Sequence, residues 1–102
     1  MIVNLSQQNS LVSTWVSELR DVTVQGDRMR FRRNLERIGE VAAYEISKTL
    51  EYEPYEVETP LGTANAYLPA QRIVLATILR AGLPFHQGML NYFDDADNTF
   101  IA

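Results

Sequence analysis

The sequence predicts an α/β protein that contains the beginning of a parallel sheet. Residues 73–79 form a short, uncharged apolar run, which is typical of a strand buried on both faces of such a sheet. Gly82 can adopt loop angles that other residues avoid, and Pro84 suits the first turn of a helix, which we expect over about 84–93. Residues 98–102 then have the pattern of another strand. A strand, a helix and a strand in this order predict a βαβ unit with parallel strands.

Composition limits the classes of function. The 102 residues suit one domain with a modest core, and 46% hydrophobic with 22% charged residues is typical of soluble globular proteins. A net charge of −4 argues against nucleic acid as the main partner, and the lack of cysteine excludes disulfides and thiolate sites. No stretch approaches the roughly 20 apolar residues of a membrane span, and the start does not resemble a signal peptide. We therefore expect a cytoplasmic protein without a membrane partner.

Two helices are predicted in the first half of the chain. Ser10 is a candidate N-cap for the first, and because Trp15 is costly to leave in water, its apolar face must be covered by this subunit or a second one. Asp27 is a candidate N-cap for a long helix over about 28–50, in which Gly39 favours a close contact with another helix. The apolar residues expected on the buried stripe of the long helix are Phe31, Leu35, Ile38, Ala42, Ile46 and Leu50.

The long helix is also rich in arginine, which leaves two interpretations. The arginines are Arg28, Arg30, Arg32, Arg33 and Arg37. Such a cluster can bind phosphates or RNA. However, Arg32–Glu36 and Arg37–Glu40 have the i,i+4 and i,i+3 spacings of helical ion pairs, so a solvated face or a subunit contact is the favoured interpretation.

A hairpin is predicted between the helices and the sheet. Residues 55–59 alternate apolar and acidic side chains, residues 60–62 suit a turn, and residues 63–67 suit a returning strand. The resulting division is a helical arm (1–52), a hairpin (53–70) and the first βαβ unit (71–102). A parallel sheet needs helices on both faces, and so small a sheet cannot have both. We therefore interpret the chain as the front part of a larger α/β domain whose C-terminal half is absent.

The candidate functional residue is Arg80, at the carboxyl end of the predicted buried strand. Ligands of open α/β sheets bind at that end, and the N-terminus of the following helix favours anions. We therefore predict that Arg80 holds phosphate or pyrophosphate, with a surface ion pair as the alternative. His86 is the single histidine, and a role at the helix surface or in packing is favoured over substrate contact. The aspartates Asp94, Asp95 and Asp97 lack the spacing of a calcium loop and predict a polar turn.

Three stretches resemble the N-terminal half of the uracil phosphoribosyltransferases, a type I phosphoribosyltransferase family. They are residues 9–12, then Arg30-Phe31-Arg32 with Ala43-Tyr44-Glu45, and finally 76–83 with Gly88; Leu-Arg-Ala-Gly-Leu at 79–83 is the most specific part. The resemblance covers almost the whole chain. It implies an incomplete type I phosphoribosyltransferase (Rossmann-like) fold with two N-terminal helices, a β-hairpin and the start of a parallel sheet.

The resemblance also implies an activity and a site. The activity is transfer of the ribosyl 5-phosphate group of phosphoribosyl pyrophosphate to uracil, which yields UMP and pyrophosphate in pyrimidine salvage. Mg²⁺ bound through the pyrophosphate is the implied cofactor, and a homodimer is the implied assembly. Arg80 is assigned to gripping pyrophosphate, and the backbone of Ala81 and Gly82 to the rest of that loop. No catalytic residue and no metal ligand is assigned within the chain.

Two features of the family are missing from the sequence. The phosphoribosyl-binding signature, an acidic residue followed by Ala-Thr-Gly-Gly-Ser, is absent, and so is the uracil-binding segment. Gln87 also stands where the family often has an acidic residue. We therefore expect the 102-residue chain to be inactive alone. The alternative function is a pyrimidine-operon regulator of the same fold that binds RNA, and a third hypothesis is a structural fragment whose half-sheet drives dimerisation or aggregation.

Overall fold

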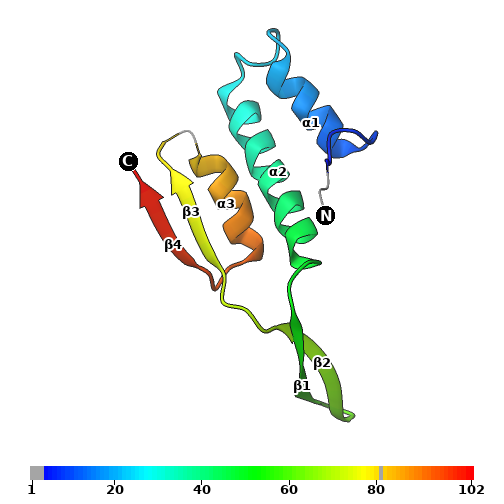
Figure 1. Ribbon diagram of the computed structural model, residues 1–102. Helices are drawn as coiled ribbons and strands as arrows, with labels where there is room; N and C mark the ends of the chain where they lie inside the picture. Colours follow the sequence, from blue (N-terminus) through cyan, green and yellow to red (C-terminus); the bar gives the residue numbers. More distant parts are fainter. Residues whose placement is uncertain (1–3, 81) are drawn as a thin grey trace.

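The computed structural model of the chain describes residues 4–80 and 82–102 as the predicted α/β arrangement. Its elements are α1 (Leu11–Arg20), α2 (Arg28–Ser47), β1 (Tyr52–Thr59), β2 (Gly62–Pro69), β3 (Val74–Ile78), α3 (Leu83–Tyr92) and β4 (Asp97–Ile101). In Figure 1, α1, α2 and α3 lie in succession beside the β3–β4 pair. The β1–β2 hairpin projects away from the helices, beyond the C-terminal end of α2. This confirms the predicted fold class, with an incomplete parallel sheet.

Side-chain caps begin both N-terminal helices where the sequence predicts them. The Ser10 hydroxyl accepts from the backbone N–H of Val12 at 3.2 Å, and the Ser13 hydroxyl accepts from the N–H of Ser10 at 3.0 Å, which forms a capping box. The Asp27 carboxylate accepts from the N–H of Arg30 at 3.0 Å. These bonds satisfy backbone donors that a helix start leaves unpaired.

The first helix packs on the second helix of the same chain. Val12 is buried, and Trp15 is half-buried with the Arg37 guanidinium 6.0 Å from its ring centroid. The open question of what covers this apolar face is therefore answered in part by α2. None of the helices within residues 4–80 and 82–102 is long and apolar enough to cross a membrane.

The buried line of α2 differs from the predicted stripe. The helix ends at Ser47, earlier than the predicted residue 50. None of the stripe residues is fully buried, and Phe31 and Ile46 remain 36% and 41% exposed. The buried positions are Asn34, Gly39 and Ala43. The stripe prediction is wrong because hydrophobicity marks a face that prefers burial, whereas small side chains decide where a neighbouring helix can approach.

The ion pairs of α2 also differ from the predicted ones, because other arginines and carboxylates are paired. Among the described residues, Arg33 pairs with Glu36 at 2.7 Å, and Arg30 pairs with Glu18 of α1 at 3.0 Å. Neither Arg32–Glu36 nor Arg37–Glu40 is found among them. Sequence spacing shows which partners a helical side chain can reach, but it does not show a carboxylate on a neighbouring helix that competes for it.

Within residues 4–80 and 82–102, one face of the parallel sheet is covered and the other is open. β3 and β4 pair in parallel with Thr77 opposite Phe100. Leu75 and Thr77 are buried on the side of α3, whereas Val74 and Ile78 are 60% and 68% exposed. The prediction that 73–79 is buried on both faces is therefore wrong for this chain, because α3 is the one helix that the described residues place against the strand.

The hairpin is longer than predicted and stands apart from the helices. β1 and β2 pair over eight residues each. Gly62 has φ +127°, a backbone conformation that side chains disfavour, so the glycine is required at this turn. The Tyr52 hydroxyl donates to the Ser47 carbonyl at 2.7 Å and ties the hairpin to the end of α2. The three-part division at residues 52 and 70 stays a prediction.

The acidic turn before β4 is confirmed in part. Asp94 and Asp95 lie in the turn, whereas Asp97 opens β4 and forms an ion pair with Arg72. The Arg72 Nε and Nη2 donate to the two carboxylate oxygens at 2.7 and 2.9 Å. This bidentate pair connects the segment before β3 with the first residue of β4, and it lowers the pKa of Asp97 through the hydrogen bond first and the charge second.

Candidate functional site at the carboxyl end of the sheet

Arg80 lies in a tight loop between β3 and α3. The Leu79 N–H donates to the Ile101 carbonyl at 2.8 Å, and the Gly82 N–H donates to the Ile78 carbonyl at 3.2 Å. The Leu79–Arg80 peptide bond is cis. The side chain of Arg80 is exposed, and its position at the carboxyl end of the strand is the one that the sequence predicts.

Gly82 is needed for space rather than for unusual backbone angles. Its φ of −75° and ψ of −10° are open to any residue, so the sequence-based reason for this glycine is wrong. A Cβ here would overlap the Thr77 hydroxyl and lie 2.9 Å from the Ile78 carbonyl oxygen. The glycine therefore lets the loop close onto the end of β3. Ala81, the other predicted backbone contributor, lies outside the described residues.

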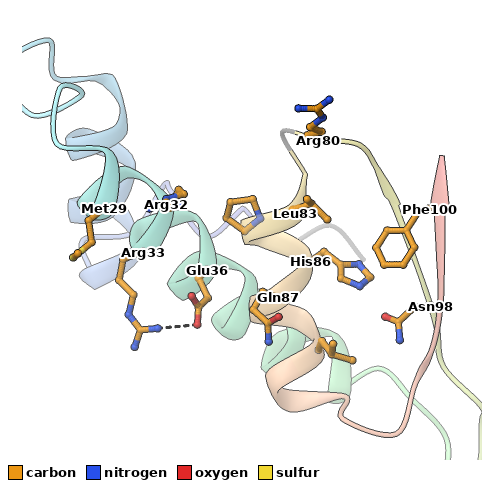
Figure 2. A pocket seen from close by; sticks show the side chains of 12 residues that line it. Met29, Arg32, Arg33, Glu36, Arg80, Leu83, His86, Gln87, Asn98 and Phe100 are labelled. Atoms are coloured by element: carbon orange, nitrogen blue, oxygen red, sulfur yellow. Dashed lines mark hydrogen bonds and ion pairs between the residues drawn. The ribbon is translucent and has the colours of Figure 1, made fainter. Parts of the chain in front are cut away.

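An open cavity of about 800 Å³ adjoins this loop. Figure 2 shows that α2, the start of α3 and β4 all contribute side chains to it. The lining residues are Met29, Arg32, Arg33, Glu36, Arg80, Leu83, Pro84, His86, Gln87, Leu90, Asn98 and Phe100. The predicted pyrophosphate residue and part of the arginine-rich helix therefore lie on the same cavity.

The cavity has a basic margin. Arg33 is engaged by Glu36, whereas the ion pairs found among the described residues include neither Arg32 nor Arg80. In Figure 2 the Arg80 guanidinium points outward from the loop, away from His86 and Phe100. Arg80 therefore stands at the rim of the cavity. This exposed position suits contact with an anion arriving from solvent.

Sequence reasoning missed the two arginines of α2 as cavity residues. Their spacing favours a solvated face or a subunit contact over phosphate or RNA binding for Arg32 and Arg33, because nothing in that spacing places the face beside residue 80. The one available signal was Gly39, which predicts a close helix contact. That contact is confirmed, and it brings the first half of α2 next to the loop.

His86 packs inside the fold. It is 7% exposed, and its ring centroid lies 5.1 Å from that of Phe100 at an interplanar angle of 48°. The contact follows from the strand register, because Phe100 pairs with the buried Thr77 and so points to the α3 side. Of the two favoured roles, packing is confirmed and a place on the helix surface is not.

Gln87 belongs to a polar chain that links α3 to α2. Its Nε2 donates to the Asn91 Oδ1 at 2.7 Å. The Asn91 Nδ2 in turn donates to Glu36 at 3.1 Å and to Glu40 at 2.8 Å. A neutral amide at position 87 therefore orients Asn91 toward the carboxylates of α2.

The chemistry that these residues offer is anion binding beside an apolar wall. Within the part of the chain that the structure describes, no group of three or more His, Asp or Glu side chains is placed to hold a metal ion. The charged groups at the cavity are three arginines and one glutamate, and Leu83, Leu90 and Phe100 supply apolar surface. Guanidinium groups bind phosphate and carboxylate oxygens through paired hydrogen bonds.

Comparison with known proteins gives a consistent result. The family model for uracil phosphoribosyltransferase matches residues 6–102. Two Porphyromonas gingivalis proteins named uracil phosphoribosyltransferase are each 55% identical to this chain over 101 residues, which is 99% of the chain and 47% of the relative. A Methanothermobacter thermautotrophicus protein of the same name is 46% identical over 78 residues, covering 74% of this chain and 36% of its own length.

A solved structure shows the same likeness. The structure of the AQ2163 protein from Aquifex aeolicus superposes with a TM-score of 0.76 at 30% sequence identity, over 98% of this chain and 47% of that one. The chain thus spans about half the length of the P. gingivalis relatives and of the A. aeolicus protein.

Proposed function

Because the chain belongs to the uracil phosphoribosyltransferase family, we propose that it is the pyrophosphate-binding half of an enzyme that makes UMP and pyrophosphate from uracil and phosphoribosyl pyrophosphate. The observation that carries the proposal is Arg80, exposed at the carboxyl end of β3 and at the rim of the cavity that Arg32 shares. This is the end of a parallel sheet at which ligands bind.

Arg80 is the residue that contacts the leaving group in this proposal. When the bond from the ribose carbon to pyrophosphate breaks, negative charge grows on the pyrophosphate oxygens. A guanidinium can donate two parallel hydrogen bonds to such oxygens and so stabilises the transition state more than the ground state. Gly82 supports this role indirectly, because the missing Cβ lets the loop close against Thr77.

The matched part is about half the length of the P. gingivalis relatives, and we propose that the remaining steps need the part of that length that this chain does not match. The described residues hold no cluster of three or more potential metal ligands, and we propose that Mg²⁺ arrives bound to the pyrophosphate group. We also propose that the 102 residues alone do not catalyse the reaction. We propose in addition that the whole enzyme is a cytoplasmic homodimer that acts in pyrimidine salvage. The RNA-binding alternative gains no support, because Arg30 and Arg33 are engaged in ion pairs.

The test joins residues 1–102 to the second half of a P. gingivalis relative in one polypeptide. We expect this protein to form UMP from uracil and phosphoribosyl pyrophosphate. Arg80→Ala should lower kcat by at least about 100-fold, because losing a single transition-state hydrogen-bond donor already costs that much and the guanidinium offers two; Arg80→Lys should lower it by less. Arg20→Ala, an exposed arginine at the end of α1, is the matched control and should keep full activity.

Two results would contradict the proposal. A folded joined protein without activity, measured beside an active P. gingivalis protein, would exclude the enzymatic role. Full activity in Arg80→Ala would exclude the assigned role of Arg80 while leaving the activity itself in place.

A further inference from the structure

Arg32 of α2 lines the same cavity as Arg80, and both side chains are exposed. The two residues come from elements that are far apart in the sequence, the first half of α2 and the loop after β3. Within residues 4–80 and 82–102, the ion pairs engage neither guanidinium. The third arginine of the cavity, Arg33, is paired with Glu36. Two cationic groups are therefore left for a ligand.

The carboxylate that the sequence spacing offers to Arg32 is held by other partners. Glu36 lies four positions after Arg32, which is the spacing of a helical ion pair. Its Oε1 accepts instead from Arg33 Nη1 at 2.7 Å and from Asn91 Nδ2 at 3.1 Å. Asn91 is oriented in turn by the bond from Gln87 Nε2. This polar chain between α2 and α3 keeps Glu36 occupied and leaves the Arg32 guanidinium available.

The crossing of α2 and α3 carries Arg32 toward the loop of Arg80. The helices are in close contact at Gly39, whose Cβ position lies 3.3 Å from the Cα of Gly88. In Figure 1, both helices begin toward the end of the molecule at which β3 stops. Arg32 lies about two turns before Gly39, and the loop directly precedes α3. Both arginines therefore lie on the same side of the crossing.

We propose that Arg32 is a second substrate-binding residue, which donates to the phosphate group of pyrophosphate that Arg80 does not hold. The inference rests on the proposed function for the identity of the ligand. The planar fork of one guanidinium matches two oxygens of a single phosphate group. A ligand with two linked phosphate groups can therefore engage both arginines at once, whereas a single phosphate group cannot use both forks fully.

The role of Arg32 differs from that of Arg80. Arg80 is proposed to act on the charge that grows when the bond to pyrophosphate breaks. Arg32 binds the outer part of the same group, which is charged before and after that step. An interaction that is equally strong in the ground state and the transition state lowers KM and leaves kcat unchanged. Arg32 should therefore contribute to substrate and product binding rather than to the rate of the chemical step.

The binding test follows the arginine side-chain Nε–H signals by NMR while inorganic pyrophosphate is added to residues 1–102. We expect the Arg32 and Arg80 signals to shift along one binding curve. The signal of Arg20, an exposed arginine at the end of α1, should stay in place. Because binding is measured without turnover, a failure of the proposed activity would leave this result unaffected.

The variant test compares pyrophosphate with inorganic phosphate. Arg32→Ala should weaken pyrophosphate binding by about tenfold or more, the effect of losing a charge-assisted hydrogen bond. Phosphate binding should change much less, because Arg80 alone can hold one phosphate group. Arg20→Ala is the matched control, since it removes the same charge elsewhere, and it should leave both affinities unchanged. Circular dichroism checks that the variants keep their helices.

Kinetics of the joined protein give a second measurement. Arg32→Ala should raise the KM for phosphoribosyl pyrophosphate by about tenfold and should change kcat far less than Arg80→Ala does. An equal fall of kcat in the two variants would contradict the separate roles.

Other outcomes of the binding tests overturn the inference. An Arg32 signal that stays in place, with or without a shift of Arg80, would show that Arg32 does not bind pyrophosphate. Equal shifts of Arg20 and Arg32 would show attraction by charge alone. Equal losses of phosphate and pyrophosphate affinity in Arg32→Ala would show that the two arginines do not divide the two phosphate groups. An active joined protein with an unmoved Arg32 signal would remove this inference and leave the proposed function in place.

Discussion

Gly39 of α2 and Gly88 of α3 meet backbone to backbone where the two helices cross. A Cβ on Gly39 would lie 3.3 Å from the Cα of Gly88 and would overlap the carbonyl oxygen of Phe85. A Cβ on Gly88 would lie 2.9 Å from the backbone N of Glu40 and would overlap the carbonyl oxygen of Glu36. This crossing places α2, with its arginines, beside the loop that carries Arg80.

We predict that Gly39→Ala destabilises the chain although alanine is the better helix former. Its helix preference is worth about 1 kcal/mol, but the new methyl group meets backbone atoms that cannot rotate away, and overpacking typically costs about 1–3 kcal/mol. The midpoint of urea unfolding should therefore fall. Gly26→Ala is the control, since apart from its chain neighbours none of the described residues has an atom within 4 Å of a Cβ there. Equal midpoints for Gly39→Ala and the original chain would contradict the close crossing.

Sequence reasoning succeeded where a local rule decides the outcome. The caps at Ser10 and Asp27, the helix after Gly82 and the hairpin all depend on residues that lie within a few positions of one another. The location of Arg80 follows in the same way, since it requires only that a strand ends and a helix begins around it.

Sequence reasoning failed where a neighbour in space decides. Phe31 belongs to the most hydrophobic stripe of α2, yet Asn34 is buried because α1 brings Glu18 to it. Ile78 lies in an apolar run typical of a buried strand, yet it is exposed because the helices that the structure describes cover only the other face of the sheet. Arg32 lines the cavity because α2 crosses α3, and the spacing of residues in the sequence does not show that crossing.

The buried amide of Asn34 should control the titration of Glu18. Asn34 is 1% exposed and donates to Glu18 Oε2 at 3.0 Å, and this bond, followed by the one from Arg30, lowers the pKa of Glu18 below its ordinary 4.5. A lowered pKa means that the carboxylate contributes stability above about pH 4.5 and loses it as the pH falls through the lowered value. We predict that Asn34→Leu raises the pKa of Glu18 and reduces the fall in the free energy of unfolding as the pH is lowered.

The measurement is a carboxyl NMR titration combined with urea unfolding at pH 7 and pH 3. Asn65→Leu, at an exposed hairpin position, is the matched control. An unchanged pKa of Glu18 in Asn34→Leu would show that the bond between the two side chains is not formed in solution.

The ion pair of Arg72 and Asp97 should be detectable in the titration of Asp97 but should contribute little to the free energy of unfolding. The side chains are 74% and 55% exposed, and exposed pairs contribute little to folding. The Arg72 guanidinium still lowers the pKa of Asp97 below its ordinary 3.8, so this carboxylate should titrate under that value. Arg72→Gln or 1 M salt should move the pKa back up, while the urea midpoint at pH 7 changes little. An Asp97 that titrates at 3.8 in the original chain would contradict the pair.

The contact between His86 and Phe100 should act as a coupled pair that holds α3 on the sheet. Their ring centroids lie 5.1 Å apart, within the range in which aromatic pairs gain about 0.5–1.5 kcal/mol beyond the burial of their area. We predict that His86→Ala and Phe100→Ala each lower the free energy of unfolding. The double variant should lose less than the sum of the two, because either substitution already removes the shared contact.

Urea unfolding of the four proteins in this cycle measures the coupling. The single substitutions should differ in size, because His86 is 7% exposed and leaves a cavity, whereas Phe100 is 51% exposed and already meets water. His86→Phe serves as the control, since it keeps an aromatic ring against Phe100 and should retain most of the stability. Strictly additive losses would mean that the two rings do not touch in solution, and α3 would then be held to the sheet by Leu75 and Thr77 instead.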